Sequence, residues 1–262
     1  MKKIIGKLVN RMLQPLGYEI VSTHYKNVVL AAGSPKRPVG RMDLLLEDLK
    51  VRGLNCTTIL DVGANKTNWC RKAKKVYPTA NLCLIEPQVE MEERLENFCK
   101  EFPGSVYFLV GAGARKERLI LTVDEQFASS SLLPKSEQTL IESGEQREIE
   151  ITTIDELIAT SKMKLPELVK LDIQGFELET LKGAKTIFGH TQVFILEVSL
   201  FPFTNTPDTP VFSEVIQFML DRGYVTYDFP GFLRRPLDGA LGQCDICFVK
   251  KDGFLRKSNE WE

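Results

Sequence analysis

The segment "TTILDVGANKTNWC" (residues 57–70) combines a strand-like run, a turn and the start of a helix. Apolar and β-branched residues at 57–60 predict a buried strand. "DVGAN" (residues 61–65) is typical of a tight turn, and residues 69–76 have a helix-like composition with Thr67 or Asn68 as N-cap. A strand that passes through a glycine turn into a helix N-terminus is a common ligand-binding arrangement. The segment therefore predicts a ligand site. The residues at the ends of the other predicted strands indicate which ligand it binds.

The same alternation of strand and helix continues along the chain. Residues 81–88 predict a second strand and 106–116 a third, with an amphipathic helix between them. Residues 167–175 and 192–201 predict two further buried strands separated by another helix. Such alternation favours a doubly wound α/β fold, with a parallel sheet and helices on both faces.

The chain ends in two strand-like pieces, "YVTYDF" and "CDICFVK", which a short polar region joins. We therefore expect a final hairpin whose last strand runs antiparallel to the others. A second hairpin is predicted earlier, from residues 119–123 and 147–152, with a serine-rich mobile loop between its strands. Thr153 and Glu156 then form a capping box for the next helix.

Composition and charge restrict the class of protein. The 262 residues include 34 basic and 35 acidic side chains, so there is no basic excess of the kind that nucleic-acid binding requires. No apolar run approaches the roughly 20 residues of a transmembrane helix. Without a recognisable secretory signal, we expect a cytoplasmic protein whose six cysteines are free thiols. Cys244 and Cys247 lie three residues apart on a predicted strand, so their side chains should point to opposite faces.

The N-terminal residues 1–50 are predicted to form a helical extension, and residues 51–262 the main domain. Apolar residues recur at helical spacing through positions 4–16, while Lys2, Lys3, Lys7 and Arg11 gather on the other side. Two interpretations remain open for this basic amphipathic helix. It packs on the main domain, as most amphipathic helices do, or it makes peripheral contact with a membrane surface.

The predicted carboxyl edge of the sheet indicates the ligand, because open parallel sheets bind ligands there. The edge has no lysine-bearing phosphate loop, and Gly63 alone supplies too few glycines for a pyrophosphate. Glu86, at the end of the second strand, suits hydrogen bonding to both hydroxyls of a ribose. A nucleoside that has a ribose and no phosphates satisfies both observations. S-adenosylmethionine is such a molecule.

Five short motifs of the sequence resemble those of a known family. "ILDVGAN", "LIEPQ", "ASSSL", "KLDIQGFELETLKGA" and "ILEVS" occur in the order found in FkbM-family methyltransferases, and the resemblance covers roughly residues 55–250. It implies a Rossmann-like, seven-stranded methyltransferase sheet with six parallel strands and a reversed last strand. It also implies O-methylation of a sugar, a glycan or a related natural product.

The chain departs from this family at two positions. Thr67 stands where the family commonly has glycine, two residues beyond Asn65. Gln174 stands where the family commonly has a glutamate, so one carboxylate of the D-x-E-G-x-E pattern is missing. The two departures favour the alternative of a non-catalytic module that keeps the fold and serves a partner. An NAD-type oxidoreductase is a further alternative, against which the missing glycines count.

Site residues are predicted from the ends of the strands. Asp172 is the candidate base for a hydroxyl acceptor, although it could instead orient the acceptor or the cofactor. Glu197 is the second catalytic candidate, and Ser130, Ser131 and Glu177 are candidates for acceptor binding. No histidine, aspartate and glutamate cluster has metal-ligand spacing. The predicted cofactor-binding residues are Asp61, Gly63, Ala64, Asn65, Glu86, Pro87, Gly111 and Ala112.

Overall fold

The computed structural model describes residues 33–124, 127, 129–133, 137–202 and 208–261. The chain divides into two units, Met1–Pro38 and Val39–Glu262, and every helix and strand named below belongs to the second. The predicted amphipathic helix at residues 4–16 lies outside the described residues. Within the described ranges, no helix is both long and apolar enough to cross a membrane.

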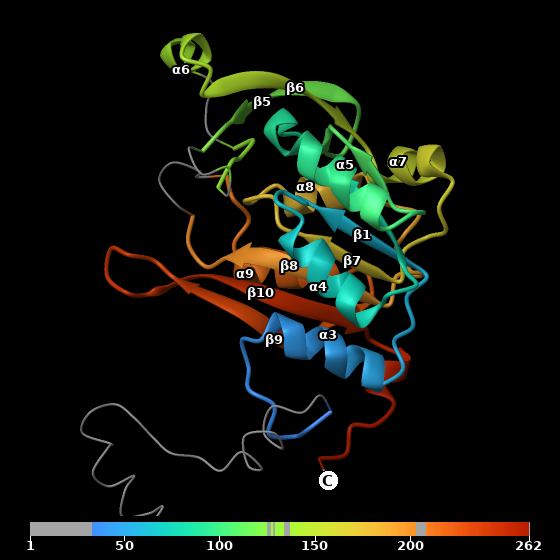
Figure 1. Cartoon of the computed structure of the whole chain (residues 1–262). Coiled ribbons are helices and arrows are strands. Elements are labelled where there is room, and N and C mark those ends of the chain that lie inside the picture. Colours follow the sequence, from blue (N-terminus) through green and yellow to red (C-terminus); the bar gives the residue numbers. More distant parts are fainter. Residues whose placement is uncertain (1–32, 125–126, 128, 134–136, 203–207, 262) are drawn as a thin grey trace, which may run out of the picture. The chain divides into compact units, whose positions relative to one another are not determined.

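The centre of the second unit is a seven-stranded sheet with the order β3-β2-β1-β7-β8-β10-β9 (Figure 1). In this sheet, the adjacent strands β3, β2, β1, β7 and β8 run parallel to one another, whereas β10 is antiparallel to both of its neighbours, β8 and β9. The prediction of six strands in one direction and a reversed last strand is therefore confirmed. The strands are β1 (Thr58–Val62), β2 (Asn81–Ile85), β3 (Val106–Phe108), β7 (Leu168–Leu171), β8 (Val193–Ser199), β9 (Tyr224–Arg234) and β10 (Leu241–Lys250).

Helices cover both faces of this sheet, as the β–α alternation predicts. Side chains of α3, α4 and α5 form one apolar core with the sheet, and side chains of α7, α8 and α9 form the other. The helices are α3 (Met42–Val51), α4 (Asn68–Val76), α5 (Glu92–Glu101), α6 (Gln138–Glu142), α7 (Ile154–Ser161), α8 (Glu177–Lys182) and α9 (Phe212–Leu220), with short 3-10 turns at Val89–Met91 and Phe254–Arg256.

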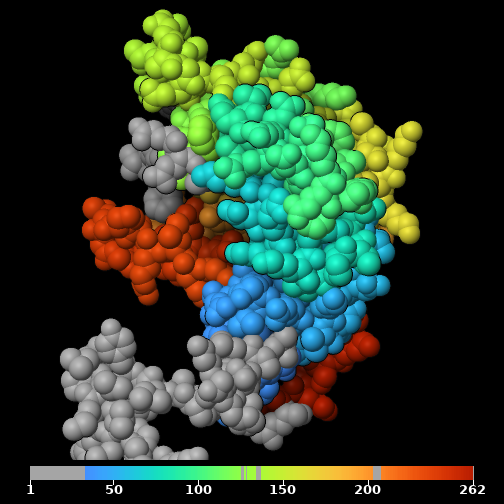
Figure 2. Space-filling model, viewed as in Figure 1, coloured from blue at the N-terminus to red at the C-terminus, as the bar shows by residue number. Residues whose placement is uncertain are grey.

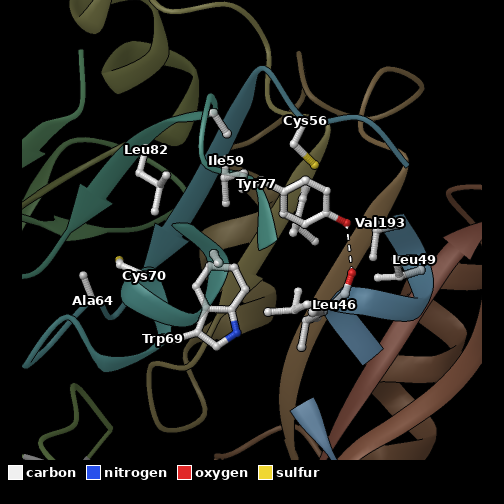
Figure 3. Close-up of a cluster of buried hydrophobic side chains, with 14 of the residues drawn as sticks. Leu46, Leu49, Cys56, Ile59, Ala64, Trp69, Cys70, Tyr77, Leu82 and Val193 are labelled. Carbon is white, nitrogen blue, oxygen red and sulfur yellow. Dashed lines mark hydrogen bonds between the residues drawn. The ribbon is translucent and has the colours of Figure 1, made fainter. Parts of the chain in front are cut away.

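Helix α3 belongs to the second unit, Val39–Glu262. Leu45, Leu46 and Leu49 of this helix are fully buried in the first core. The carbonyl oxygen of Leu46 accepts a hydrogen bond of 3.2 Å from the Tyr77 hydroxyl (Figure 3). Each buried leucine contributes roughly 1.5–3 kcal/mol, which binds α3 firmly to the sheet.

A second, three-stranded sheet has the order β4-β6-β5 and stands beyond one edge of the main sheet (Figure 1). Its strands are β4 (Gly111–Ala112), β5 (Glu117–Thr122) and β6 (Gln146–Thr152). The predicted hairpin of β5 and β6 is confirmed. Of the predicted capping box of α7, the Thr153 half is found: Thr153 Oγ1 accepts from the Glu156 N–H. The Glu156 carboxylate instead contacts Thr152 Oγ1 and Lys116.

The prediction of one strand over residues 106–116 is wrong, because the chain leaves the main sheet after Phe108. Gly111 and Ala112 pair instead with Ile151 and Thr152 of β6. A Cβ atom on Gly111 would lie 2.4 Å from the Ile151 side chain, so glycine allows this close approach. Local apolar composition could not reveal a break that long-range pairing creates.

All six cysteines are free thiols. Cys244 packs in the core beneath α7, α8 and α9, and Cys247 packs in the opposite core. The expectation that they point to opposite faces of their strand is confirmed.

Gly63 explains why the opening segment needs glycine after β1. Its φ is +83°, and a Cβ atom there would lie 2.0 Å from the backbone oxygen of Asp172. Gly189 has almost the same φ, +82°, with nothing within 4 Å of its Cβ position. We expect Gly63→Ala to cost about 1–3 kcal/mol more stability than Gly189→Ala, because only the former adds a backbone collision to the strain of a positive φ.

Urea denaturation of the two glycine variants and the parent protein measures this difference. Equal losses of stability in Gly63→Ala and Gly189→Ala would contradict the close approach of Gly63 to the Asp172 backbone.

Candidate active site

A cavity of about 240 Å³ opens at the carboxyl ends of β1, β2 and β7, where the sequence analysis places the ligand. Apolar side chains from β2 and β5, among them Ile85 and Leu121, form part of its wall. Eight predicted site residues line it: Gly63, Asn65, Glu86, Pro87, Gly111, Ala112, Ser130 and Asp172. Five others do not: Asp61, Ala64, Ser131, Glu177 and Glu197.

Glu86 is held rigidly at the end of β2. Its Oε2 accepts a hydrogen bond of 2.8 Å from the Asn65 N–H, and its Oε1 accepts from the Gln88 N–H at 3.0 Å and the Gln88 Nε2 at 3.1 Å. Burial raises the pKa of Glu86, and the hydrogen bonds from Gln88 and Asn65 oppose this shift. The three donors fix the orientation of a carboxylate that retains lone pairs for hydroxyl groups.

Two residues of the loop in the inserted hairpin, Phe127 and Ser130, are hydrogen-bonded beside Glu86. The backbone oxygen of Phe127 accepts hydrogen bonds from Asn65 Nδ2 and from Gln88 Nε2, the latter at 3.1 Å. Ser130 donates from Oγ to Gln88 Oε1 at 2.9 Å. Amides that follow β1 and β2 therefore connect the insertion to the strand ends, and Phe127 and Ser130 become walls of the cavity.

Asp172 faces the cavity from the end of β7 and is paired with a buried lysine. Lys170 Nζ lies 2.8 Å from Asp172 Oδ2, and Gln174 Nε2 donates to Asp172 Oδ1 at 3.3 Å. Burial alone would raise the pKa of Asp172, but the charge and the hydrogen bond of Lys170 outweigh burial and lower it. The side chain is 34% exposed, so Asp172 is an ionised carboxylate that a ligand in the cavity can reach.

Asp61 and Ala64 lie outside the cavity lining. Asp61 is fully buried, where Cys70 of α4 donates from Sγ to its Oδ2 at 2.8 Å. Side chains alternate along a strand, so Asp61 points to the same face as Ile59, which packs in the core beneath α4. Burial raises the pKa of Asp61, and the positive charge of Lys170 opposes this shift. The side chain thus contacts α4 and interacts electrostatically with Lys170.

Ser131 and Glu197 lie beside the cavity. Ser131 Oγ donates to the backbone oxygen of Gln174 at 3.1 Å. Glu197 Oε2 accepts from Gln174 Nε2 at 2.8 Å and from Gln243 Nε2 at 3.3 Å. Burial, followed by the charge of Asp172, raises the pKa of Glu197 well above its ordinary value. Gln174 therefore donates to both catalytic candidates, Asp172 and Glu197.

Glu177 holds the turn after β7. Its Oε1 accepts from the Ile173 N–H at 2.9 Å and from the Gly175 N–H at 3.3 Å. The residue is 4% exposed, and burial raises the pKa of Glu177 to about 7. This placement favours support of the turn over contact with an acceptor.

The raised pKa of Glu177 predicts a specific dependence of stability on pH. The folded protein binds this proton more tightly than the unfolded chain, so unfolding free energy should fall as pH rises from about 4.5 to about 7. Glu177→Gln keeps the oxygen that accepts both N–H groups and cannot ionise. We expect the variant to lose this slope and to gain up to about 3 kcal/mol above pH 7 relative to the parent.

Urea denaturation of Glu177→Gln and the parent at pH 5, 6, 7 and 8 tests this expectation. Parallel stability curves for the two proteins across that range would contradict it.

Three non-glycine residues that line the cavity have positive φ: Asn65 at +42°, Phe127 at +63° and Gln174 at +56°. Thr67, at +61°, lies two residues beyond Asn65 and outside the cavity lining. Thr67 is the N-cap of α4, and its side chain makes no capping hydrogen bond. Such conformations cost of order 1–3 kcal/mol each and concentrate at functional sites. The hydrogen bonds of Asn65, Phe127 and Gln174 keep these residues in their strained backbone conformations.

Sequence reasoning did not identify Gln88 and Phe127 as site residues. Gln88 follows Glu86 by two residues, where a side-chain amide can bond the preceding carboxylate, so a local signal was present. Phe127 lies in a polar loop and reaches the site only because the insertion folds back onto β1 and β2. No local pattern indicates that contact.

This doubly wound sheet, with its reversed last strand and a cavity at its carboxyl edge, has the architecture of the Rossmann-like methyltransferase fold. The Methyltransferase FkbM domain matches residues 61–226, which is more than half of the chain. The protein therefore belongs to the FkbM methyltransferase family. A comparison with curated proteins found no match.

Solved structures with a similar fold are distant in sequence. The precorrin-6y C5,15-methyltransferase of Geobacter metallireducens GS-15 is 13% identical, over 79% of this chain and 86% of that one, with a TM-score of 0.41. Fibrillarin of Aeropyrum pernix, solved with S-adenosyl-L-methionine, is 12% identical over 78% and 73%, with a TM-score of 0.43. An O-methyltransferase family protein from Burkholderia thailandensis is 8% identical over 80% and 60%, with a TM-score of 0.41.

Proposed function

We propose that the protein is an S-adenosylmethionine-dependent O-methyltransferase that acts on a hydroxyl of a sugar, a glycan or a related natural product. The observation that carries this proposal is that Glu86 and Asp172 face one cavity from the ends of β2 and β7. One carboxylate suits the hydroxyl pair of a ribose, and the other suits removal of a proton from an acceptor hydroxyl.

The chemistry of the cavity supports a nucleoside cofactor. Glu86 would accept hydrogen bonds from the two ribose hydroxyls, and its three internal donors keep it in position. Ile85, Leu121 and Phe127 offer apolar surface to a flat base. The match to the FkbM family supports the same cofactor.

When bound, S-adenosylmethionine would supply an electrophilic methyl group for transfer to the acceptor oxygen, with its sulfur as the leaving group. Asp172 would take the proton from the acceptor hydroxyl as a general base. Its ion pair with Lys170 keeps it ionised, which this role requires. The strand ends hold the groups in place, and such positioning supplies much of the rate enhancement.

Isothermal titration calorimetry with S-adenosylmethionine, S-adenosylhomocysteine and NADH tests the cofactor assignment. We expect the two adenosyl compounds to bind with one site per chain and NADH to bind much more weakly. Absence of binding by both adenosyl compounds to the folded full-length protein would overturn the proposal and favour a non-catalytic module. Preferential binding of NADH would favour an oxidoreductase.

A further inference from the structure

A second cavity, of about 180 Å³, lies at the carboxyl ends of β8 and β9. Glu197 of β8 and Gln243 and Asp245 of β10 supply its polar side chains, while Phe232 and Leu233 of β9 supply apolar ones. The β9–β10 hairpin, in red, projects from the body of the molecule on this side (Figure 2). The cavity is thus a polar pocket with an apolar rim.

Two carboxyl groups in this cavity have capacity for a ligand. Asp245 and Glu197 are directly paired across β10 and β8. Within the described part of the chain, no hydrogen bond to the Asp245 carboxylate is found. Glu197 Oε2 accepts from Gln174 and Gln243, and a side-chain hydrogen bond also joins Glu197 to Asp172. A Cβ atom on Gly231 would lie 2.0 Å from Asp245 Oδ2, so glycine makes room for this carboxylate. The remaining lone pairs of the two carboxyl groups can accept hydrogen bonds from hydroxyl groups.

The apolar rim is exposed yet fixed in position. Phe232 is 49% exposed and Leu233 is 58% exposed. The Phe232 ring stacks on Phe229 at a centroid distance of 6.0 Å, and Phe229 stacks in turn on Phe212 of α9 at 6.4 Å. Large apolar side chains held in contact with solvent beside a polar pocket suit an amphipathic ligand.

One side chain links this cavity to the cofactor cavity. Gln174 lines the first cavity, and its Nε2 donates to Glu197 of the second cavity at 2.8 Å and to Asp172 of the first at 3.3 Å. A hydroxyl in the place of this amide would donate to the same Asp172 oxygen. The second cavity is therefore adjacent to the group that would remove the acceptor proton.

We propose that the second cavity binds the methyl acceptor, and that the acceptor is a glycoside with an apolar aglycone. The inference rests on the proposed function. Glu197 and Asp245 accept hydrogen bonds from the sugar hydroxyls, while Phe232 and Leu233 contact the aglycone. The reacting hydroxyl lies toward Asp172, where it displaces the Gln174 amide.

The electrostatics of the two carboxyl groups favour a neutral polyol over an ammonium group. Burial and the neighbouring charge of Asp172 raise the pKa of Asp245 to about 6, and they raise the pKa of Glu197 well above its ordinary value. A partly protonated pair both donates and accepts hydrogen bonds, as the hydroxyls of a sugar do.

Saturation-transfer NMR with matched pairs of methyl and hexyl glycosides of glucose, galactose, mannose and rhamnose tests this proposal. The full-length protein is saturated with S-adenosylhomocysteine in every sample. We expect at least one hexyl glycoside to bind, and to bind about tenfold more tightly than its methyl partner, because its chain covers apolar surface.

Three variants locate the binding site. Asp245→Asn and Gly231→Ala each disturb the Asp245 carboxylate and should weaken the hexyl glycoside about tenfold or more. Leu233→Ser, at an exposed position that the fold does not require, should remove the preference for hexyl over methyl. Asp252→Asn, in the exposed turn after β10, is the matched control and should change nothing.

The outcomes separate the two proposals. If the parent protein does not bind S-adenosylhomocysteine, the proposed function is overturned. If the parent binds S-adenosylhomocysteine but no glycoside, or if the Asp245 and Leu233 variants bind the hexyl glycoside as the parent does, the acceptor assignment alone is overturned. Equal binding of methyl and hexyl glycosides would overturn the role of the apolar rim.

Discussion

Asp172→Asn should lower kcat on a hydroxyl acceptor by about 10²–10⁴-fold, the usual contribution of a general base. Asparagine keeps the shape of the side chain and can still accept a hydrogen bond from Lys170 Nζ, so the variant should fold and retain most of its affinity for S-adenosylmethionine. Turnover on the glycoside identified by NMR, cofactor affinity by calorimetry and thermal unfolding together measure the three quantities. Asp221→Asn, at an exposed position after α9, is the control.

The pH dependence of turnover provides a second readout for Asp172. Its ion pair with Lys170 outweighs burial and lowers the pKa of Asp172, so the parent should lose activity only below about pH 4, the ordinary value for aspartate. The variant should lack this acid limb. Near-parental turnover in Asp172→Asn would exclude Asp172 as the base and make Glu197 the next candidate. Collapse of cofactor binding in the folded variant would place Asp172 in the cofactor site.

Glu86→Ala should weaken S-adenosylmethionine binding by about 1–3 kcal/mol, or roughly 5–150-fold, because the ribose hydroxyls lose a charged hydrogen-bond partner. Calorimetry measures this loss directly. Glu86→Gln keeps the volume and one acceptor oxygen and should lose less. Glu93→Ala, at an exposed position in the first turn of α5, removes a carboxylate that does not line the cavity and serves as the control.

The alanine variant also leaves the N–H groups of Asn65 and Gln88 without their present acceptor. Thermal unfolding must therefore accompany the calorimetry, so that lost affinity is not confused with lost structure. A folded Glu86→Ala protein with parental affinity would show that the ribose is bound elsewhere.

The sequence predicted the main sheet well because its strands are short apolar runs that turn residues interrupt. It also located Gly63, Glu86 and Asp172, since the carboxyl ends of parallel strands converge at one edge whatever the loops do. The structure gives the reason for Gly63: the glycine makes room for the backbone of Asp172.

Other features of the site depend on contacts that no local pattern encodes. The placement of Phe127 requires the insertion to fold onto amides of β1 and β2, and the pairing of Gly111 with Ile151 requires a second sheet. The direction of Asp61 could have been predicted, because the alternation of side chains along β1 places it on the same face as Ile59. Its position at the strand end suggested the cavity instead.

The left-handed residues around the cavity have a consequence for protein engineering. Glycine at position 127 or 174 would relieve backbone strain of order 1–3 kcal/mol, so a search for heat-resistant variants would select these sites early. Glycine at 174 would also delete the amide between Asp172 and Glu197, and glycine at 127 would delete an aromatic wall of the cavity. Substitutions selected for thermostability without an activity screen would therefore accumulate in residues that line the proposed active site.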